Sequence, residues 1–152
     1  YGATSGKLFA AGLAGDRFAV RNSGATTVIE GCDSNGCEYM TGGTVVILGN
    51  VGDNFAAGMT GGMAFIYDKK QQFEKKVNPE SVVWQNVETD YWKEFLKNLI
   101  NEHLKETGSD LSKKLIESFD DEINNFIQVC PKEMLDKLKN PITLKKQVKK
   151  VS

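Results

Sequence analysis

Four glycines recur at almost constant spacing through the first part of this sequence. The intervals between Gly6, Gly24, Gly43 and Gly62 are 18, 19 and 19 residues. Each of these glycines precedes a short run without turn-forming residues, at 7–11, 25–29, 44–48 and 63–67. A fixed period near 20 residues indicates stacked repeats, because one small repeat cannot bury its own apolar face. The pattern therefore predicts a β-solenoid with these four glycines as structural corner residues.

Each repeat is also long enough for a second strand. We expect these strands within 15–20, 36–40 and 52–57, and glycines between them allow the positive φ that tight corners need. Two strands in every repeat predict a flattened parallel β-helix.

The facing of the strands is predicted from one lysine. Lys7 begins the first run, and a lysine rarely points into a dry core, so the positions equivalent to it should face outward. Side chains alternate along a strand, which turns Phe9, Thr27, Val46 and Phe65 outward as well. That face is too apolar for water, so we expect the C-terminal helices or another part of the protein to cover it. The inward positions are then Leu8, Ala10, Thr26, Val28, Val45, Ile47, Ala64 and Ile66.

The composition changes near residue 68 and divides the chain. Proline is absent before this point, whereas all three prolines and most of the lysines follow it. We predict solenoid coils at 1–68, a transition or linker at 69–89, a helical cap at 90–139 and a basic, mobile tail at 140–152.

The helical cap is predicted from apolar periodicity. Between residues 92 and 104, apolar residues recur at alternating steps of three and one, which is one face of an α-helix. Thr89 or Asp90 can cap the start of this helix at 90–107, and Gly108 can end it. Further helices are expected at 110–118, at 120–129 and from Pro131 onward.

Composition excludes several classes of function. A net charge of −1 over 152 residues gives no general attraction to nucleic acid, and no run approaches the roughly 20 apolar residues of a membrane helix. The first residues lack the pattern of a signal peptide, and three cysteines fit a reducing compartment. We therefore expect a cytoplasmic protein without nucleic-acid or membrane partners. The sequence begins without Met and in mid-pattern, so we expect a piece of a longer polypeptide.

No metal site or catalytic centre is predicted. Cys32 and Cys37 are separated by four residues, but Cys130 and the only histidine, His103, are far away in sequence. The thiols are interpreted as small buried groups. His103 lies on the apolar face of the first predicted helix, and we interpret it as a histidine packed at the edge of the core.

Two arginines are the candidate binding residues. Arg17 and Arg21 could contact an anion, because the planar guanidinium suits carboxylates and phosphates. They could equally pair with Asp16, Glu30 or Glu38 at the corners of the coils, and we favour this structural pairing. The residues themselves therefore identify no catalytic, cofactor-binding or metal-binding side chain.

Several segments resemble one known family. The string CEYMTGG at 37–43 is the most specific of them, and the segments at 17–25, 54–62, 77–80, 102–109 and 126–131 extend the likeness. The chain resembles the C-terminal, GXGXG-type domain of the glutamate synthase large subunit over about residues 1–138.

This resemblance implies a function for a parent enzyme. Glutamate synthase makes L-glutamate from L-glutamine and 2-oxoglutarate with electrons from NADH, NADPH or ferredoxin. Its amidotransferase domain releases ammonia, and a central domain with FMN and an iron–sulfur cluster consumes it. The C-terminal domain is implied to be a right-handed parallel β-helix, present here as its final coils. It would brace the other domains, carry no catalytic residue or cofactor, and lie in the cytoplasm, or in a plastid in a photosynthetic eukaryote.

Two alternatives remain open at this point. A subunit of formylmethanofuran dehydrogenase shares the solenoid, although the helical end is not expected there. The other is a stand-alone β-helix that binds a partner or holds an anion through Arg17 and Arg21.

Overall fold

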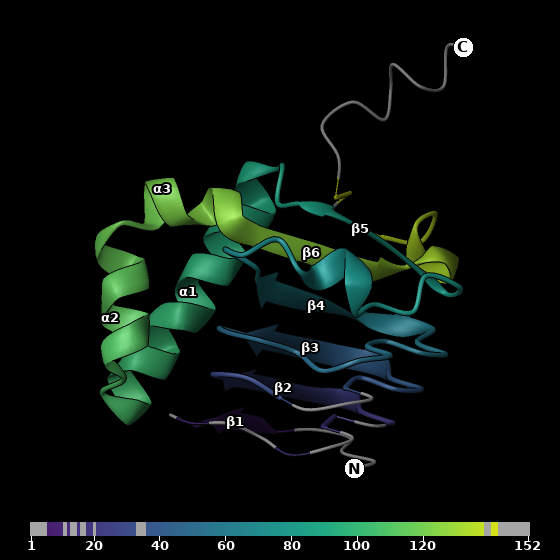
Figure 1. Cartoon of the computed structure of the whole chain (residues 1–152), viewed down its shortest axis with the longest axis horizontal. Helices are drawn as coiled ribbons and strands as arrows, with labels where there is room; N and C mark the ends of the chain where they lie inside the picture. The colour runs from purple at the N-terminus through teal and green to yellow at the C-terminus, as the bar shows by residue number, and fades with distance from the viewer. Residues whose placement is uncertain are drawn as a thin grey trace.

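One six-stranded sheet forms the centre of the molecule (Figure 1). The computed structural model describes residues 6–10, 12, 15, 18–19, 21–32, 36–138 and 141–142. The strands lie in the order β1-β2-β3-β4-β6-β5 across the sheet. Their bounds are Lys7–Phe9 (β1), Ser23–Ile29 (β2), Thr41–Ile47 (β3), Gly61–Tyr67 (β4), Val82–Asn86 (β5) and Phe126–Pro131 (β6).

Three α-helices and three short 3₁₀ turns complete the described fold. None of these helices has the length and apolar character required to cross a bilayer. Their bounds are Asp90–Thr107 (α1), Asp110–Glu117 (α2), Phe119–Glu122 (α3), Phe73–Lys75 (η1), Ile123–Asn125 (η2) and Lys132–Met134 (η3).

The predicted single-stranded right-handed parallel β-helix, or β-solenoid, is wrong. Strands β1 to β4 pair in parallel, but β6 is antiparallel to β4, and β5 is antiparallel to β6. The molecule is therefore an α/β fold around an open, mixed sheet that does not close on itself. The periodic glycines indicate only the parallel strands β1 to β4, because the antiparallel strands come from the segment that follows them in the chain.

In the described residues, the segments between the parallel strands are turns and bends with one parallel bridge, between Phe55 and Val77, not the predicted second strands. Of the strand predicted at 15–20, only residues 15, 18 and 19 are described. Left-handed backbone occurs at Cys37 (φ 60°), Tyr39 (φ 55°) and Ala56 (φ 66°), which is incompatible with extended strands there. The turns still stack on one another. The Cys37 N–H donates to the Phe18 carbonyl at 2.7 Å, and the Ala56 N–H donates to the Gly36 carbonyl at 2.8 Å. We call these stacked segments the turn layer.

One part of the predicted facing is shifted by a residue. Val28, not Thr27, pairs with Val46, and Val46 pairs with Phe65. The register changes between Ser23 and Thr26, where β2 has one residue more than β3. An extra residue in one strand turns the following side chains to the other face. Val46 and Phe65 face the helices that cover this side, as predicted.

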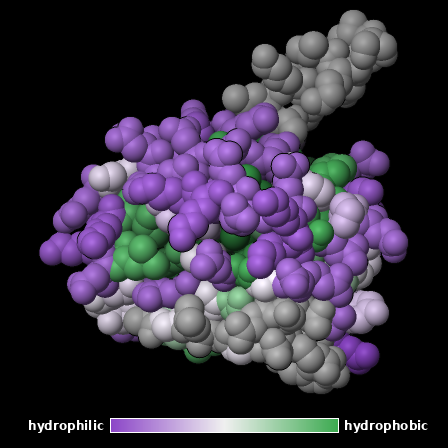
Figure 2. Space-filling view, viewed as in Figure 1, coloured by the Kyte–Doolittle hydropathy of each residue, from purple (hydrophilic) through white to green (hydrophobic). Residues whose placement is uncertain are grey.

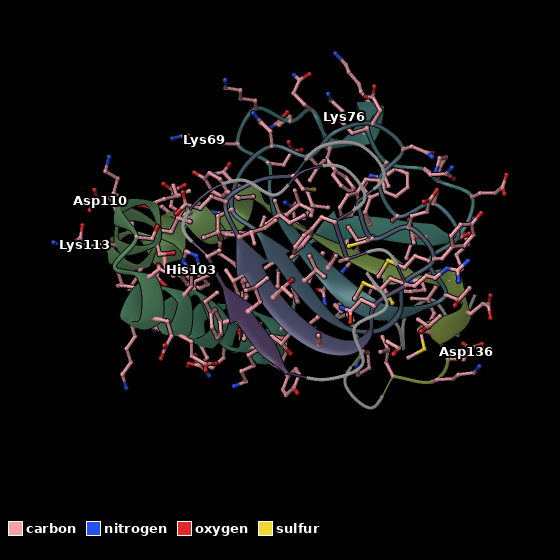
Figure 3. All side chains as sticks on the ribbon, turned by 90° about the horizontal axis from the view of Figure 1, so that it is seen from below. Lys69, Lys76, His103, Asp110, Lys113 and Asp136 are labelled. Carbon is pink, nitrogen blue, oxygen red and sulfur yellow. The ribbon has the colours of Figure 1, made fainter. Side chains whose placement is uncertain are left out.

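Two apolar cores lie on opposite faces of the sheet. The first fills the space between the sheet and the helices, with Val46, Phe65, Leu96 and Ile100 among its fully buried residues. The second lies between the sheet and the turn layer and includes Met40, Met59 and Phe55. Figure 3 shows the helices on one side of the strands and the turn layer on the other. Full burial of such side chains stabilises the fold by about 1.5–3 kcal/mol each.

Helix α1 confirms the predicted helix at 90–107, and α2 the one at 110–118 within one residue. The Thr89 hydroxyl accepts a hydrogen bond from the Trp92 N–H at 3.3 Å, which caps the start of α1. Gly108 ends the helix in the left-handed conformation, with φ 68° and its N–H on the Leu104 carbonyl.

The predicted helix at 120–129 is wrong, because Phe126–Pro131 forms strand β6. Its side chains alternate: Phe126 and Cys130 belong to the core under the helices, whereas Val129 belongs to the core under the turn layer. The helix expected from Pro131 is reduced to the 3₁₀ turn η3.

Two residues of the predicted tail are described, and both are anchored. The Trp92 indole N–H donates to the Pro141 carbonyl at 3.1 Å, and the Gln85 amide donates to the Ile142 carbonyl at 2.7 Å. Ile142 is 3% exposed and packs in the core under the helices. The remainder of the tail, residues 140 and 143–152, lies outside the described residues.

Candidate functional site

The two candidate arginines are only partly described. Arg17 and Asp16 lie outside the described residues. Arg21 is exposed and engaged by an interaction within the molecule, and its backbone N–H donates to the Glu38 carbonyl at 2.9 Å. An anion contact at these arginines therefore stays a prediction.

The three cysteines are buried, reduced thiols. Burial, and secondarily the neighbouring Cys32, raise the pKa of Cys37 above its usual value. Burial raises the pKa of Cys130 to about 11. Both pKa values disfavour the thiolate that metals and nucleophilic catalysis require. In the described part of the chain, no group of three or more His, Cys, Asp or Glu residues is arranged to hold a metal ion.

His103 is buried at the junction of α1, α2 and the sheet, as the prediction of a core histidine requires. Its Nε2 lies 2.7 Å from the Ala10 carbonyl, and its Nδ1 lies 2.6 Å from the Ser112 hydroxyl. A carbonyl can only accept, so Nε2 carries the proton, and in the neutral ring Nδ1 accepts from Ser112.

Two further polar contacts tie the helices to the sheet near His103. The Ser109 hydroxyl donates to the Glu30 carboxylate at 2.6 Å, directly after the end of β2. The same oxygen accepts from the Ser112 N–H at 3.2 Å and so caps α2. Lys7 in β1 adds an exposed ion pair with Glu102 at 3.2 Å.

We call Ala10, Glu30, His103, Ser109 and Ser112 the helix anchor. His103 and Ser112 have no exposed surface. A substrate therefore cannot reach either side chain, and both nitrogens of the ring already have partners. This arrangement can position helices but offers no accessible base or nucleophile. The sequence carries a signal for part of it, because a serine directly before a helix is a preferred N-cap.

A surface groove follows the carboxyl ends of the parallel strands. Its largest part is a cavity of about 500 Å³ lined by residues that directly follow β2, β3 and β4, among them Glu30, Leu48 and Asp68. A second cavity, of about 240 Å³, shares Asp68 and Lys70 with the first. A third, of about 370 Å³, also reaches Asp68 and extends to Trp84.

We call this surface the Asp68 groove. Ligands of open sheets with parallel strands bind at the carboxyl ends of those strands. Sequence reasoning missed the groove because it is assembled from strand ends about one repeat apart. Its charged lining comprises Glu30, Asp68, Glu74, Lys69, Lys70 and Lys76.

Comparison with known proteins identifies the class of this chain. Residues 1–132 match the sequence model of the family described as GXGXG motif. The chain therefore belongs to the GXGXG-motif family.

The relatives of the chain are glutamate synthases, as the sequence resemblance indicated. Over 148 residues it is 58% identical to the glutamate synthase (NADPH) large chain of Azospirillum brasilense. This alignment covers 97% of this chain and 10% of that protein. Over 151 residues it is 45% identical to the glutamate synthase (NADH) of Schizosaccharomyces pombe. This alignment covers 99% of this chain and 7% of that protein. Over 131 residues it is 50% identical to a ferredoxin-dependent glutamate synthase of Pyropia yezoensis. This alignment covers 86% of this chain and 8% of that protein. The chain thus spans a tenth or less of the length of these curated relatives.

Proposed function

We propose that this chain is a structural, non-catalytic domain of a glutamate synthase. The parent enzyme would make L-glutamate from L-glutamine and 2-oxoglutarate in the cytoplasm or in a plastid. In this proposal the domain braces the amidotransferase domain against the domain that holds FMN and an iron–sulfur cluster. The observation that carries it is the helix anchor, where the buried histidine and its serine partner are committed to holding helices on a sheet.

The donor set of this chain does not fit an iron–sulfur cluster. Such clusters need several cysteine thiolates around one site. Burial of Cys37 and Cys130 raises their pKa values, and in the described residues no third ligand joins Cys32 and Cys37. In this proposal the cluster is held by another part of the parent enzyme, and FMN belongs to the same domain as the cluster.

Stiffness supports the bracing role. Strands β2, β3 and β4 are hydrogen-bonded in parallel, and the turn layer repeats the connection on the other face. Ammonia released at one active site must reach another without escaping to water, so the two sites need a fixed spacing. A sheet bonded at both its strands and its turns can supply that spacing.

Activity of the isolated 152-residue chain tests the non-catalytic part of this proposal. We expect no glutamine hydrolysis, no glutamate formation and no FMN binding above the level of a denatured control. A specific activity or stoichiometric FMN binding would overturn it.

The bracing part is tested in the full-length enzyme. His103→Gln should loosen the helix anchor, so more glutamine should be hydrolysed for each glutamate formed from 2-oxoglutarate. Lys113→Gln, on the exposed surface of α2, is the matched control and should leave this ratio unchanged. An unchanged ratio in the His103 variant, with helix mobility measurably increased, would contradict bracing.

An anion contact at Arg17 and Arg21 is a secondary proposal. Titration of the chain with phosphate or a dicarboxylate should show saturable binding that Arg21→Ala removes. A flat titration of the wild-type chain would reject it.

A further inference from the structure

Two of the three carboxylates that line the Asp68 groove, those of Asp68 and Glu30, accept hydrogen bonds from within the molecule, and the third, that of Glu74, lies at the end near Trp84. The two carboxylate oxygens of Asp68 accept the backbone N–H groups of Gln72 and Phe73 at 2.9 and 3.0 Å. The carboxylate of Glu30 accepts the Ser109 hydroxyl. Neither carboxylate therefore needs a cation from outside.

The three lysines of the groove are unpaired or only weakly paired within the described residues. Lys69 and Lys70 are exposed, and within the described residues neither ammonium has a hydrogen-bond or ion-pair partner. Lys76 lies 3.7 Å from Asp53, whose side chain is 79% exposed, and exposed pairs of this kind hold weakly. Unmatched donors thus remain on one wall, which favours an occupant that carries carboxylates.

The shape of the groove favours an extended polypeptide over a small ion. Three cavities share Asp68 as a lining residue, and together their linings extend from the end of β2 to Trp84 on the edge strand β5. Figure 2 shows that the surface over η1, beside this groove, is largely hydrophilic. Figure 3 shows Lys69 and Lys76 projecting from the same side of the molecule, whereas Lys113 lies at the helical end.

The geometry points to the Asp68 groove as a docking site for an extended, acidic segment of the rest of the glutamate synthase large chain. Lys69 and Lys70 would contact the carboxylates of that segment. This inference rests on the proposed function: the alignments cover a tenth or less of the matched relatives, and such a segment would lie in the part that this chain does not cover. It adds which face of the domain is gripped and by what chemistry.

Amine footprinting of the full-length large chain tests the inference. Acetylation rates of Lys69, Lys70 and Lys113 are measured by mass spectrometry in the folded enzyme and normalised to the urea-unfolded enzyme. We expect Lys69 and Lys70 to be acetylated several-fold more slowly than Lys113. Carbodiimide, which joins amines to carboxylates in direct contact, should link Lys69 or Lys70 to an Asp or Glu outside this domain.

Charge reversal supplies the matched variants. Lys69→Glu together with Lys70→Glu should weaken the contact, so that Lys76 in the same groove is acetylated faster than in the wild-type enzyme, whereas Lys113→Glu should leave the rate at Lys76 unchanged. Acetylation of Lys69 and Lys70 at the rate of Lys113 overturns the inference, as does protection that appears only with added phosphate and disappears on dialysis. Either outcome, combined with slow acetylation of other lysines of this domain, rejects the groove while the bracing proposal stands.

Discussion

Gly62, near the start of β4, shows how tightly neighbouring strands approach each other. Its φ is 84°, and a Cβ there would lie 2.7 Å from the Met40 methyl carbon and 2.9 Å from the Gly42 backbone. Gly108 has a similar φ of 68°, but a Cβ would meet nothing within 4 Å. Substitutions at the two positions therefore separate the energetic cost of backbone strain from that of steric contact.

We expect Gly108→Ala to lower the free energy of unfolding by about 1 kcal/mol, the cost of a left-handed alanine. Gly62→Ala should lower it by more than about 2 kcal/mol, because crowding against Gly42 backbone adds to the same strain. Urea unfolding at 25 °C measures both values. Equal losses would mean that the close approach at Gly62 has no energetic consequence.

Cys130 predicts a pH dependence of stability. Burial raises its pKa to about 11 in the folded protein, whereas an unfolded thiol titrates near pH 8.5, as a rough reference value. The unfolded chain thus loses this proton first, so the contribution of Cys130 to stability is complete below about pH 8.5 and is lost as pH rises toward 11.

The free energy of unfolding should therefore decline over this range of pH. Cys130→Val removes the titrating thiol while keeping an apolar side chain, so its decline should be shallower than that of the wild-type chain. Denaturant titrations at stepped pH measure the two slopes. Identical slopes would contradict the assignment to Cys130.

At residue scale, the spacing of the glycines does not predict the register, and Gly24, Gly43 and Gly62 lie inside β2, β3 and β4, near their starts. Gly6, Gly43 and Gly62 have positive φ, whereas the start of β2 around Gly24 is held by Asn22. The Asn22 side chain accepts the Gly24 and Ala25 N–H groups and donates to the Ala25 carbonyl. The spacing of glycines gives no information about a side chain that hydrogen-bonds to the backbone in this way. The extra residue in β2 therefore cannot be predicted from that spacing.

At the scale of elements, the helix anchor depends on Ser112. Replacing Ser112 with Ala leaves the buried Nδ1 of His103 without its donor, which should lower the free energy of unfolding by about 1–3 kcal/mol. Ser118→Ala is a suitable control, because Ser118 is exposed and its side chain caps no helix. Urea unfolding and hydrogen exchange of α2 amides give the readout. Equal stability of the two variants would mean that the His103 contact does not hold the helices.

The sequence predicts α1 well and β6 badly, for physical reasons. Helix α1 has a long apolar face, an N-cap at Thr89 and a C-terminal glycine, all of which are local signals. Strand β6 is short, and Ile123, Phe126 and Ile127 also fit helical spacing. Its hydrogen-bond partners lie in β4 and β5, so only the tertiary structure decides its conformation.

At the scale of the whole molecule, the antiparallel insertion joins the two halves of the sequence. Strand β6 lies between β4 and β5, so the residues after 90 complete the sheet rather than only covering it. We expect a variant truncated after residue 89 to lose cooperative thermal unfolding, because β4 and β5 would lose their shared neighbour. Circular dichroism and near-UV absorbance should show one coincident transition for the 152-residue chain and none for the truncated chain. A cooperative transition in the truncated chain would contradict this.

The two cores also divide the intrinsic fluorescence of the protein. Only two tryptophans occur in the sequence: Trp92 packs with Phe65 under the helices, and Trp84 packs with Phe73 in the core under the turn layer. Each layer consequently contains its own optical reporter. Replacing one tryptophan with Phe isolates the emission of the other, so loosening of the helices and loosening of the turns can be followed as separate signals in one molecule.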